Sequence, residues 1–155
     1  MNRRRFLLVS TGGIATLAGC GFNSSTPAEY EFALGSHNGS LYDCGGHAFR
    51  LTGSESRLRI EGQLPPKDTT CYNTSAEVYW GPEGQTLTAE VRTKKKGLLS
   101  ECTSSSRPIQ YTLTTPVGIS GYSRFVLQHL HEGEVQYRYS RDTAKIVPPV
   151  EQADC

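Results

Sequence analysis

The sequence lacks an apolar run long enough to cross a membrane as a helix. Its most apolar stretch covers only residues 6–18 and is interrupted by serine, threonine and glycine, whereas a membrane span needs roughly 20 apolar residues. The chain also lacks a strong charge of either sign, because 16 lysines and arginines stand against 15 acidic residues. This balance gives no indication of nucleic-acid binding, and it is far from the acidic excess of proteins adapted to near-saturated salt.

The first twenty residues instead have the features of an export signal. Arg3 and Arg4, followed by Phe6, Leu7 and a weakly apolar core, resemble a twin-arginine signal. The Leu-Ala-Gly-Cys sequence that ends at Cys20 resembles a lipobox, where a lipoprotein signal is cut and the new N-terminal cysteine is acylated. We therefore expect a lipid on Cys20 and a location on the extracytoplasmic face of the cell membrane. The alternative is a buried N-terminal helix with a core cysteine.

This interpretation divides the chain into three parts. Residues 1–19 are the predicted signal peptide, 20–28 the lipidated cysteine with a flexible tether, and 29–155 a single folded domain. Removal of the signal takes away three arginines, which leaves 13 basic residues against 15 acidic ones and a net charge of −2. The exported chain is long enough for one domain with a real core.

A helical pattern is absent after residue 20, and apolar residues alternate with polar ones in short runs. Turn residues separate these runs about every eight to twelve positions, which favours an antiparallel β-sandwich of the Ig-like or Greek-key type over the alternative, a small β-barrel. Asn38-Gly39 predicts a hairpin turn, and the tail from residue 145 is expected to be held only by its cysteine. The expected strands cover residues 29–34, 41–44, 48–51, 56–64, 76–80, 85–93, 109–114, 125–130 and 135–139.

Four cysteines remain if Cys20 carries a lipid. An even number in an exported chain predicts two disulfides, and three connectivities are open. We prefer Cys71–Cys102, which closes a loop around the middle of the domain, together with Cys44–Cys155, which holds the tail. The gaps of 26, 30 and 52 residues between these cysteines are too long for a typical zinc site.

The middle of the chain also carries an ordered set of strand and cysteine motifs. They are Leu58-Arg59-Ile60-Glu61-Gly62, Cys71, Leu87-Thr88-Ala89-Glu90-Val91, Cys102, Tyr111-Thr112-Leu113 and Phe125-Val126-Leu127-Gln128-His129. Together with the signal segment, this pattern over residues 56–131 resembles a group of uncharacterised exported lipoproteins from archaea. The resemblance implies that Cys71 and Cys102 pair, and it implies no activity. The modest acid content departs from the strongly acidic members of that group.

His129 and His131 form the best candidate for a metal pair, because residues two apart on a strand project to one face. Further ligands would have to come from Glu132, Glu134, His37 or His47 through folding. The alternative is two histidines at the solvent-exposed end of a strand, and we expect no metal and no cofactor. Ser, Asp and His residues show no spacing typical of an activated serine.

Three surface features allow recognition roles. Lys94, Lys95 and Lys96 could contact anionic headgroups or a surface polymer, or simply form a solvated loop that discourages edge pairing. Tyr137 and Tyr139 share one face and are expected to be core, with a recognition patch as the alternative. Sequons for glycosylation occur in predicted loops at Asn23, Asn38 and Asn73.

The sequence therefore favours a lipid-anchored extracytoplasmic binding or accessory module with no catalytic residues. We expect attachment to the membrane through the lipid, a protein or glycan partner, and no nucleic acid. One alternative is an exported metal-dependent or hydrolytic enzyme centred on His129 and His131. The other is an accessory subunit of a transporter or cell-envelope complex.

Overall fold

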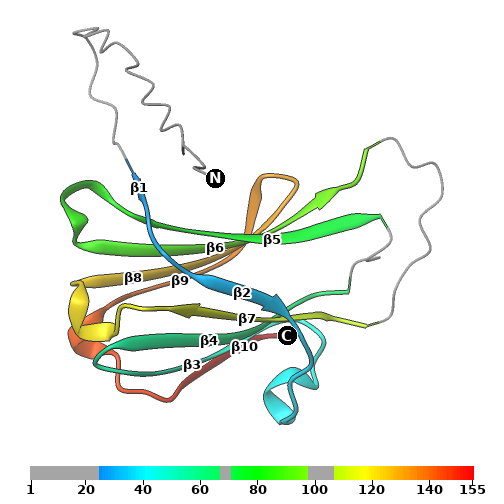
Figure 1. Ribbon diagram of the computed structural model, residues 1–155. Coiled ribbons are helices and arrows are strands. Elements are labelled where there is room, and N and C mark those ends of the chain that lie inside the picture. The colour runs from blue at the N-terminus through cyan, green and yellow to red at the C-terminus, as the bar shows by residue number, and fades with distance from the viewer. Residues whose placement is uncertain (1–24, 67–70, 98–106) are drawn as a thin grey trace, which may run out of the picture.

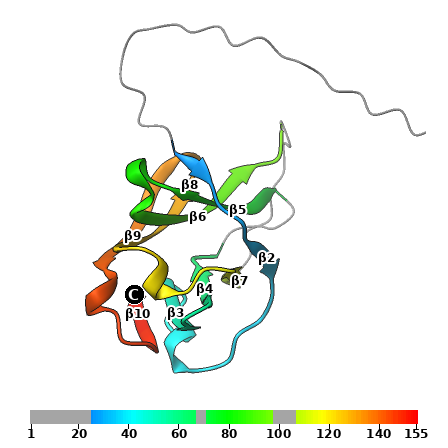
Figure 2. The ribbon, with the colours of Figure 1, turned by 60° about the vertical axis from the view of Figure 1, so that its left-hand side comes forward.

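The computed structural model describes residues 25–66, 71–97 and 107–155, and in them two β-sheets stack face to face (Figures 1 and 2). Sheet A has the strand order β1 (Thr26–Pro27), β5 (Tyr72–Trp80), β6 (Thr86–Lys95), β8 (Arg124–His131) and β9 (Glu134–Asp142). Sheet B has the order β10 (Val150–Asp154), β3 (His47–Ser54), β4 (Arg57–Leu64), β7 (Ile109–Thr115) and β2 (Glu31–Leu34). The two sheets share no strand, so the predicted sandwich is confirmed and the barrel alternative is wrong.

Period-two patterning produces these strands. In β4, Leu58 and Ile60 are fully buried while Arg57 and Arg59 on the other face are exposed. The predicted hairpin between residues 76–80 and 85–93 is confirmed as the antiparallel pair β5–β6. One pairing departs from an all-antiparallel arrangement, because β6 and β8 run parallel. The chain reaches β8 from sheet B through β7, and such a crossover allows parallel neighbours.

The predicted strand at residues 29–34 is confirmed at Glu31–Leu34, and a separate short strand at Thr26–Pro27 precedes it. Thr26 and Pro27 pair with Trp80 and Tyr79 in sheet A, whereas Glu31–Leu34 pairs with β7 in sheet B. The chain crosses from one layer to the other between these pairings. The predicted tether is therefore too long at its C-terminal end, because Thr26–Pro27 already belongs to the sandwich. The rest of the predicted tether, residues 20–24, lies outside the described residues.

The predicted hairpin turn at Asn38-Gly39 and the strand at residues 41–44 are both wrong. Ser40–Tyr42 forms a short 3-10 turn, η1, that covers the outer face of sheet B. The reason is the fully buried amide of Gln63 on β4, which donates to the carbonyls of Tyr42 at 3.1 Å and Gly46 at 3.2 Å. The amide of Gln63 therefore satisfies these backbone carbonyls, and the segment needs no strand pairing at these two groups. Gln110 on β7 extends the network by donating to the side-chain oxygen of Gln63 at 2.8 Å.

The C-terminal tail is held by more than its cysteine, which corrects the prediction for that segment. β10 forms an antiparallel ladder with β3 that runs from Val150 opposite Leu51 to Asp154 opposite His47. The close approach needs Gly46, because a Cβ there would lie 2.0 Å from the carbonyl oxygen of Asp154.

The sandwich has two ends, and the chain enters and leaves at opposite ones. The tether end holds Thr26, the turn between β5 and β6, the start of β8 and the segment after β9, and it is on the left in Figure 1. The cysteine end holds the start of β3 and the C-terminus, and Lys95 at the end of β6 lies at this same end.

Between the sheets, the ring of Tyr111 lies across β4 at Gly62. The two residues are opposite each other in the β4–β7 register. A Cβ at Gly62 would lie 2.1 Å from Cζ of Tyr111, so only glycine leaves space for the ring. The fully buried Tyr111 packs beside Phe49, Leu113, Phe125 and Leu127 in the core.

We predict that Gly62→Ala destabilises the fold by about 1–3 kcal/mol, because the added methyl group collides with a buried ring. Urea unfolding measures the free energy. Gly35→Ala is the matched control, since nothing lies within 4 Å of its ideal Cβ, and it should change stability by less than about 0.5 kcal/mol. Equal unfolding midpoints for the two variants would contradict this account.

Candidate functional site

His129 lies on the inner face of β8, and its side chain is fully buried between the two sheets. Val91 of β6 and Tyr137 of β9 are its neighbours across sheet A. Its ring centroid is 5.1 Å from that of His47 and 5.4 Å from that of Tyr137. The expected solvent-exposed position for this histidine is therefore wrong, because the alternation of β8 turns it toward the core.

The hydroxyl of Tyr111 forms a hydrogen bond of 2.7 Å with Nε2 of His129. Tyr111 belongs to sheet B and His129 to sheet A, so this bond joins the two layers. The rings meet edge-on, at an interplanar angle of 87°. Both groups are fully buried, and each would lose a polar partner if the other were removed.

The second ring nitrogen of His129 is also occupied. Its Nδ1 lies 2.9 Å from Nδ1 of His47, which belongs to β3. One arrangement of protons has Tyr111 donating to His129 and His129 donating to His47, and the reverse direction is equally consistent with the distances. In both cases His129 is neutral, and one ordered chain of hydrogen bonds connects the core with the half-buried His47.

The surroundings of His129 strongly disfavour its charged form. Burial, with a smaller electrostatic contribution from the neighbouring His47, lowers the pKa of His129 to about 3. Burial also raises the pKa of the Tyr111 hydroxyl well above its ordinary value. At neutral pH the pair is therefore an uncharged hydrogen-bonded link, with no group ready to exchange a proton with solvent.

His131 shares the inner face with His129 but lies nearer the cysteine end. Its Nδ1 is 3.0 Å from the hydroxyl of Thr93, and its ring centroid is 5.3 Å from that of Tyr72. A small pocket of about 70 Å³ opens beside it. The pocket is lined by His47, Leu64, Pro65, Thr93, Leu130, His131 and Gln136. Its size suits one or two small polar molecules rather than a large ligand.

Of the further ligands considered for a metal pair, the structure brings His47 beside His129 but not Glu132, Glu134 or His37. Among the described residues, no three His, Cys, Asp or Glu side chains form a group that could hold a metal ion. Glu132 accepts a hydrogen bond from the backbone N–H of Lys95, Glu134 is exposed, and His37 bonds through Nε2 to the carbonyl of Tyr111. His129 has both ring nitrogens occupied, so its lone pairs are not available to a metal in this arrangement.

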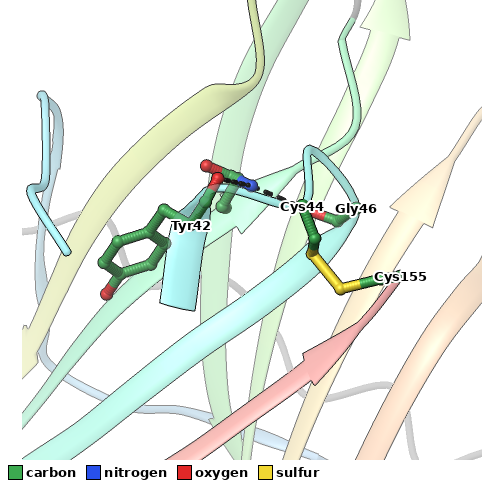
Figure 3. The surroundings of a disulfide bond; sticks show 5 residues. Tyr42, Cys44, Gly46 and Cys155 are labelled. Carbon is green, nitrogen blue, oxygen red and sulfur yellow. Dashed lines mark hydrogen bonds between the residues drawn. A yellow bond between two sulfur atoms is a disulfide. The ribbon is translucent and has the colours of Figure 1, made fainter. Parts of the chain in front are cut away.

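The predicted disulfide between Cys44 and Cys155 is confirmed, with a Cα–Cα distance of 5.6 Å (Figure 3). It joins the segment after η1 to the end of β10, and both cysteines are exposed. Cys71 is buried and also takes part in a disulfide. Its predicted partner, Cys102, lies outside the described residues, as do Cys20 and the export-signal residues Arg3, Arg4, Phe6 and Leu7.

The remaining predicted surface residues take different positions. Lys94 and Lys95 are exposed at the cysteine end, and Lys96 is partly covered, with its N–H bonded to the carbonyl of Cys71. Tyr139 is buried and Tyr137 stacks on His47, which confirms the expectation that both are core.

The sequons also differ in their surroundings. Asn38 is exposed in a loop, as expected. Asn73 is exposed but lies on strand β5, so its predicted loop position is wrong. Asn23 lies outside the described residues.

No protein-family model, curated protein or solved structure matches this chain. In the described part of the chain, no helix has the length and apolar character required to cross a membrane. The interpretation of the site therefore depends on its own geometry.

Sequence reasoning identified His129 and named His47 as one of several residues that folding could bring to it, but it missed Tyr111, because that contact depends on how the two sheets stack. One local signal was present. Gly62 interrupts the inward apolar series Leu58, Ile60 and Leu64, and a glycine at such a position indicates that another group approaches the strand closely.

We predict that His129 makes the fold sensitive to acid. Its pKa of about 3 in the folded chain lies below the ordinary value of 6.5, so the unfolded chain binds an extra proton between these values. The contribution of neutral His129 to the free energy of unfolding is complete above pH 6.5. As the pH falls toward 3, this contribution is lost at up to about 1.4 kcal/mol per pH unit. His129→Gln, compared with the unchanged chain by urea unfolding across this range, should show a shallower decline. Parallel declines would contradict the assignment.

We predict that replacing both Cys44 and Cys155 by serine lowers the free energy of unfolding by about 2–5 kcal/mol. The disulfide closes a loop with a sequence separation of 111, and its loss gives the unfolded chain more freedom. Urea unfolding without reductant measures the change. Asp43→Ser, an exposed neighbour, is the control and should leave stability nearly unchanged. A double variant as stable as this control would show that the crosslink contributes nothing.

Proposed function

We propose that the protein is a lipid-anchored extracytoplasmic β-sandwich that acts as a binding or accessory module and not as an enzyme. The observation that carries this proposal is the exposed Cys44–Cys155 disulfide. Solvent-exposed disulfides persist in oxidising compartments and are reduced in the cytosol. The crosslink therefore supports the export that the N-terminal residues predict.

The position of the tether supports the anchoring part of the proposal. Thr26 is the first residue of β1, and it lies only six positions after Cys20. A diacylated or triacylated cysteine at that place would hold the domain stably, because two or more acyl chains give lasting attachment. The absence of a strong net charge fits a module that depends on lipid, not on electrostatic attraction, to stay at the surface.

Two observations weigh against the enzyme alternative. A general base must reach the proton that it removes, but His129 is sealed in the core with both nitrogens occupied. The cleft at the tether end is also poor in suitable groups, although Glu29, Tyr30, Glu31 and Arg57 line a second cleft of about 490 Å³. In the cleft of about 540 Å³ at the tether end, Glu55 is the one titratable side chain among the described lining residues. A version centred on His129 and His131 is therefore disfavoured.

The partner is a protein or a glycan of the cell envelope, because the domain would be presented at that surface. The accessory-subunit alternative differs only in having a defined membrane complex as this partner. Purification of the lipidated protein from crosslinked membranes distinguishes the two. A fixed stoichiometric complex would favour the accessory subunit, and a spread of envelope components would favour the general binding module.

We predict that Cys20→Ser releases the protein from the membrane. The expected result is a shift from the membrane pellet to the soluble extracytoplasmic fraction, because the acylation site has been removed. Fractionation with immunoblotting measures the shift, and mass spectrometry of the wild-type N-terminus checks for the lipid. Ser25→Ala is the control and should stay in the pellet. An N-terminus at Met1 without lipid, or a Cys20→Ser variant that remains in the pellet, would refute the anchor.

A further inference from the structure

We propose that the tether end of the sandwich lies against the phospholipid bilayer, with Val147 at the contact, and that the cysteine end faces away. This inference rests on the proposed lipid at Cys20 and adds the orientation of the domain and the surface that meets the lipid. Its partner is the bilayer itself. Three features of the chain lead to it: the entry point, the length of the tether and the chemistry of the surface at that end.

The entry point is fixed by β1. Thr26 pairs antiparallel with Trp80, and Ala28 continues the contact by donating to the carbonyl of Val78 at 2.9 Å. Because β1 runs antiparallel to β5, the chain before Thr26 leaves past Trp80, beside the turn between β5 and β6. Figure 1 shows β1 entering at this end. A lipid on Cys20 would therefore pull on the tether end.

The length of the tether excludes the inverted orientation. Six residue steps separate Cys20 from Thr26 and span at most about 20 Å when fully extended. Strand β6 covers Thr86–Lys95, and its ten residues extend about 30 Å from the tether end to the cysteine end. If the cysteine end rested on the bilayer, Thr26 would stand about 30 Å above it, beyond the reach of the tether.

The surface at the tether end has the chemistry of a shallow lipid contact. Val147 follows the 3-10 turn at Thr143–Lys145. Among the large apolar residues of the described chain it is the most exposed, with 79% of its surface accessible to solvent. The cleft of about 540 Å³ lies at this end, and Ile119, Ala144 and Pro148 contribute its apolar walls. Exposed apolar loop residues favour the boundary between headgroups and acyl chains.

The same geometry assigns a different place to the lysine triplet. Lys94 and Lys95 lie at the far end of β6, about 30 Å from the tether end. That separation is about three times the screening length at ordinary ionic strength. Lys94 and Lys95 therefore do not hold the domain to anionic headgroups, and both stay exposed to the solvent on the side away from the bilayer.

Lysine labelling tests the orientation without any substitution. The lipidated full chain is bound to phosphatidylcholine vesicles and treated with a water-soluble amine-acylating reagent, and the same chain in detergent provides the reference. Lys145, at the tether end and with 73% of its side chain exposed, should become several-fold less reactive on vesicles. Lys94 and Lys95 should keep their reactivity. Equal protection of both sites, or protection of Lys94 and Lys95 alone, would overturn the orientation.

A matched pair of variants gives a second measurement. Val147→Trp and Val135→Trp place a new indole at two exposed valines, the second of which pairs with Leu130 toward the cysteine end. On vesicles with brominated acyl chains, the fluorescence of the tryptophan introduced by Val147→Trp should be quenched. The fluorescence of the tryptophan introduced by Val135→Trp should not be quenched. Equal quenching of the two would overturn the proposal. A chain that carries no lipid on Cys20 and does not bind vesicles would instead remove the proposed function, and the orientation with it.

Discussion

The hydrogen bond between Tyr111 and His129 is the contact on which the arrangement of the two sheets depends. It is a polar bond in the middle of an apolar core, and each partner would be left unsatisfied without the other. It requires β4 and β7 to place Gly62 under the tyrosine ring. It also requires β8 to point His129 inward, because a slip of one residue would turn the imidazole to the outer face. The bond therefore favours one register in each layer.

Strand β4 serves both faces of sheet B at neighbouring positions. Gly62 admits the Tyr111 ring on the inner face, while Gln63 on the outer face holds the loop that carries η1. That loop leads directly into Cys44, which is crosslinked to Cys155 beside the β3–β10 ladder. Core register, loop position and terminal crosslink are consequently connected through two adjacent residues. A change in the position of β4 would therefore alter the core register, the loop position and the terminal crosslink together.

The period-two pattern was enough to predict the sandwich, the β5–β6 hairpin and the inward faces of most strands, because one buried face dictates the alternation. It failed where distant partners decide the outcome. The Asn38-Gly39 signal was overridden by the buried Gln63, and the pairing of Thr26–Pro27 with sheet A, just before β2 in sheet B, was not predicted. The candidate site around His129 was also only partly predictable, because its contacts depend on other strands. His129 was visible in the sequence, whereas its bonds to His47 and Tyr111 span 82 and 18 positions and depend on stacking of the layers.

The Cys44–Cys155 crosslink also determines how the molecule would carry mechanical load. A force applied between the proposed lipid at Cys20 and Cys155 would pass along the chain to Cys44 and then through the disulfide to Cys155. Strands β3 to β10 lie inside the covalent loop and would not be stretched by it. Of the described strands, only β1 and β2 would be pulled from their sheets, so the molecule would lengthen at its N-terminal side while most of the sandwich stayed intact.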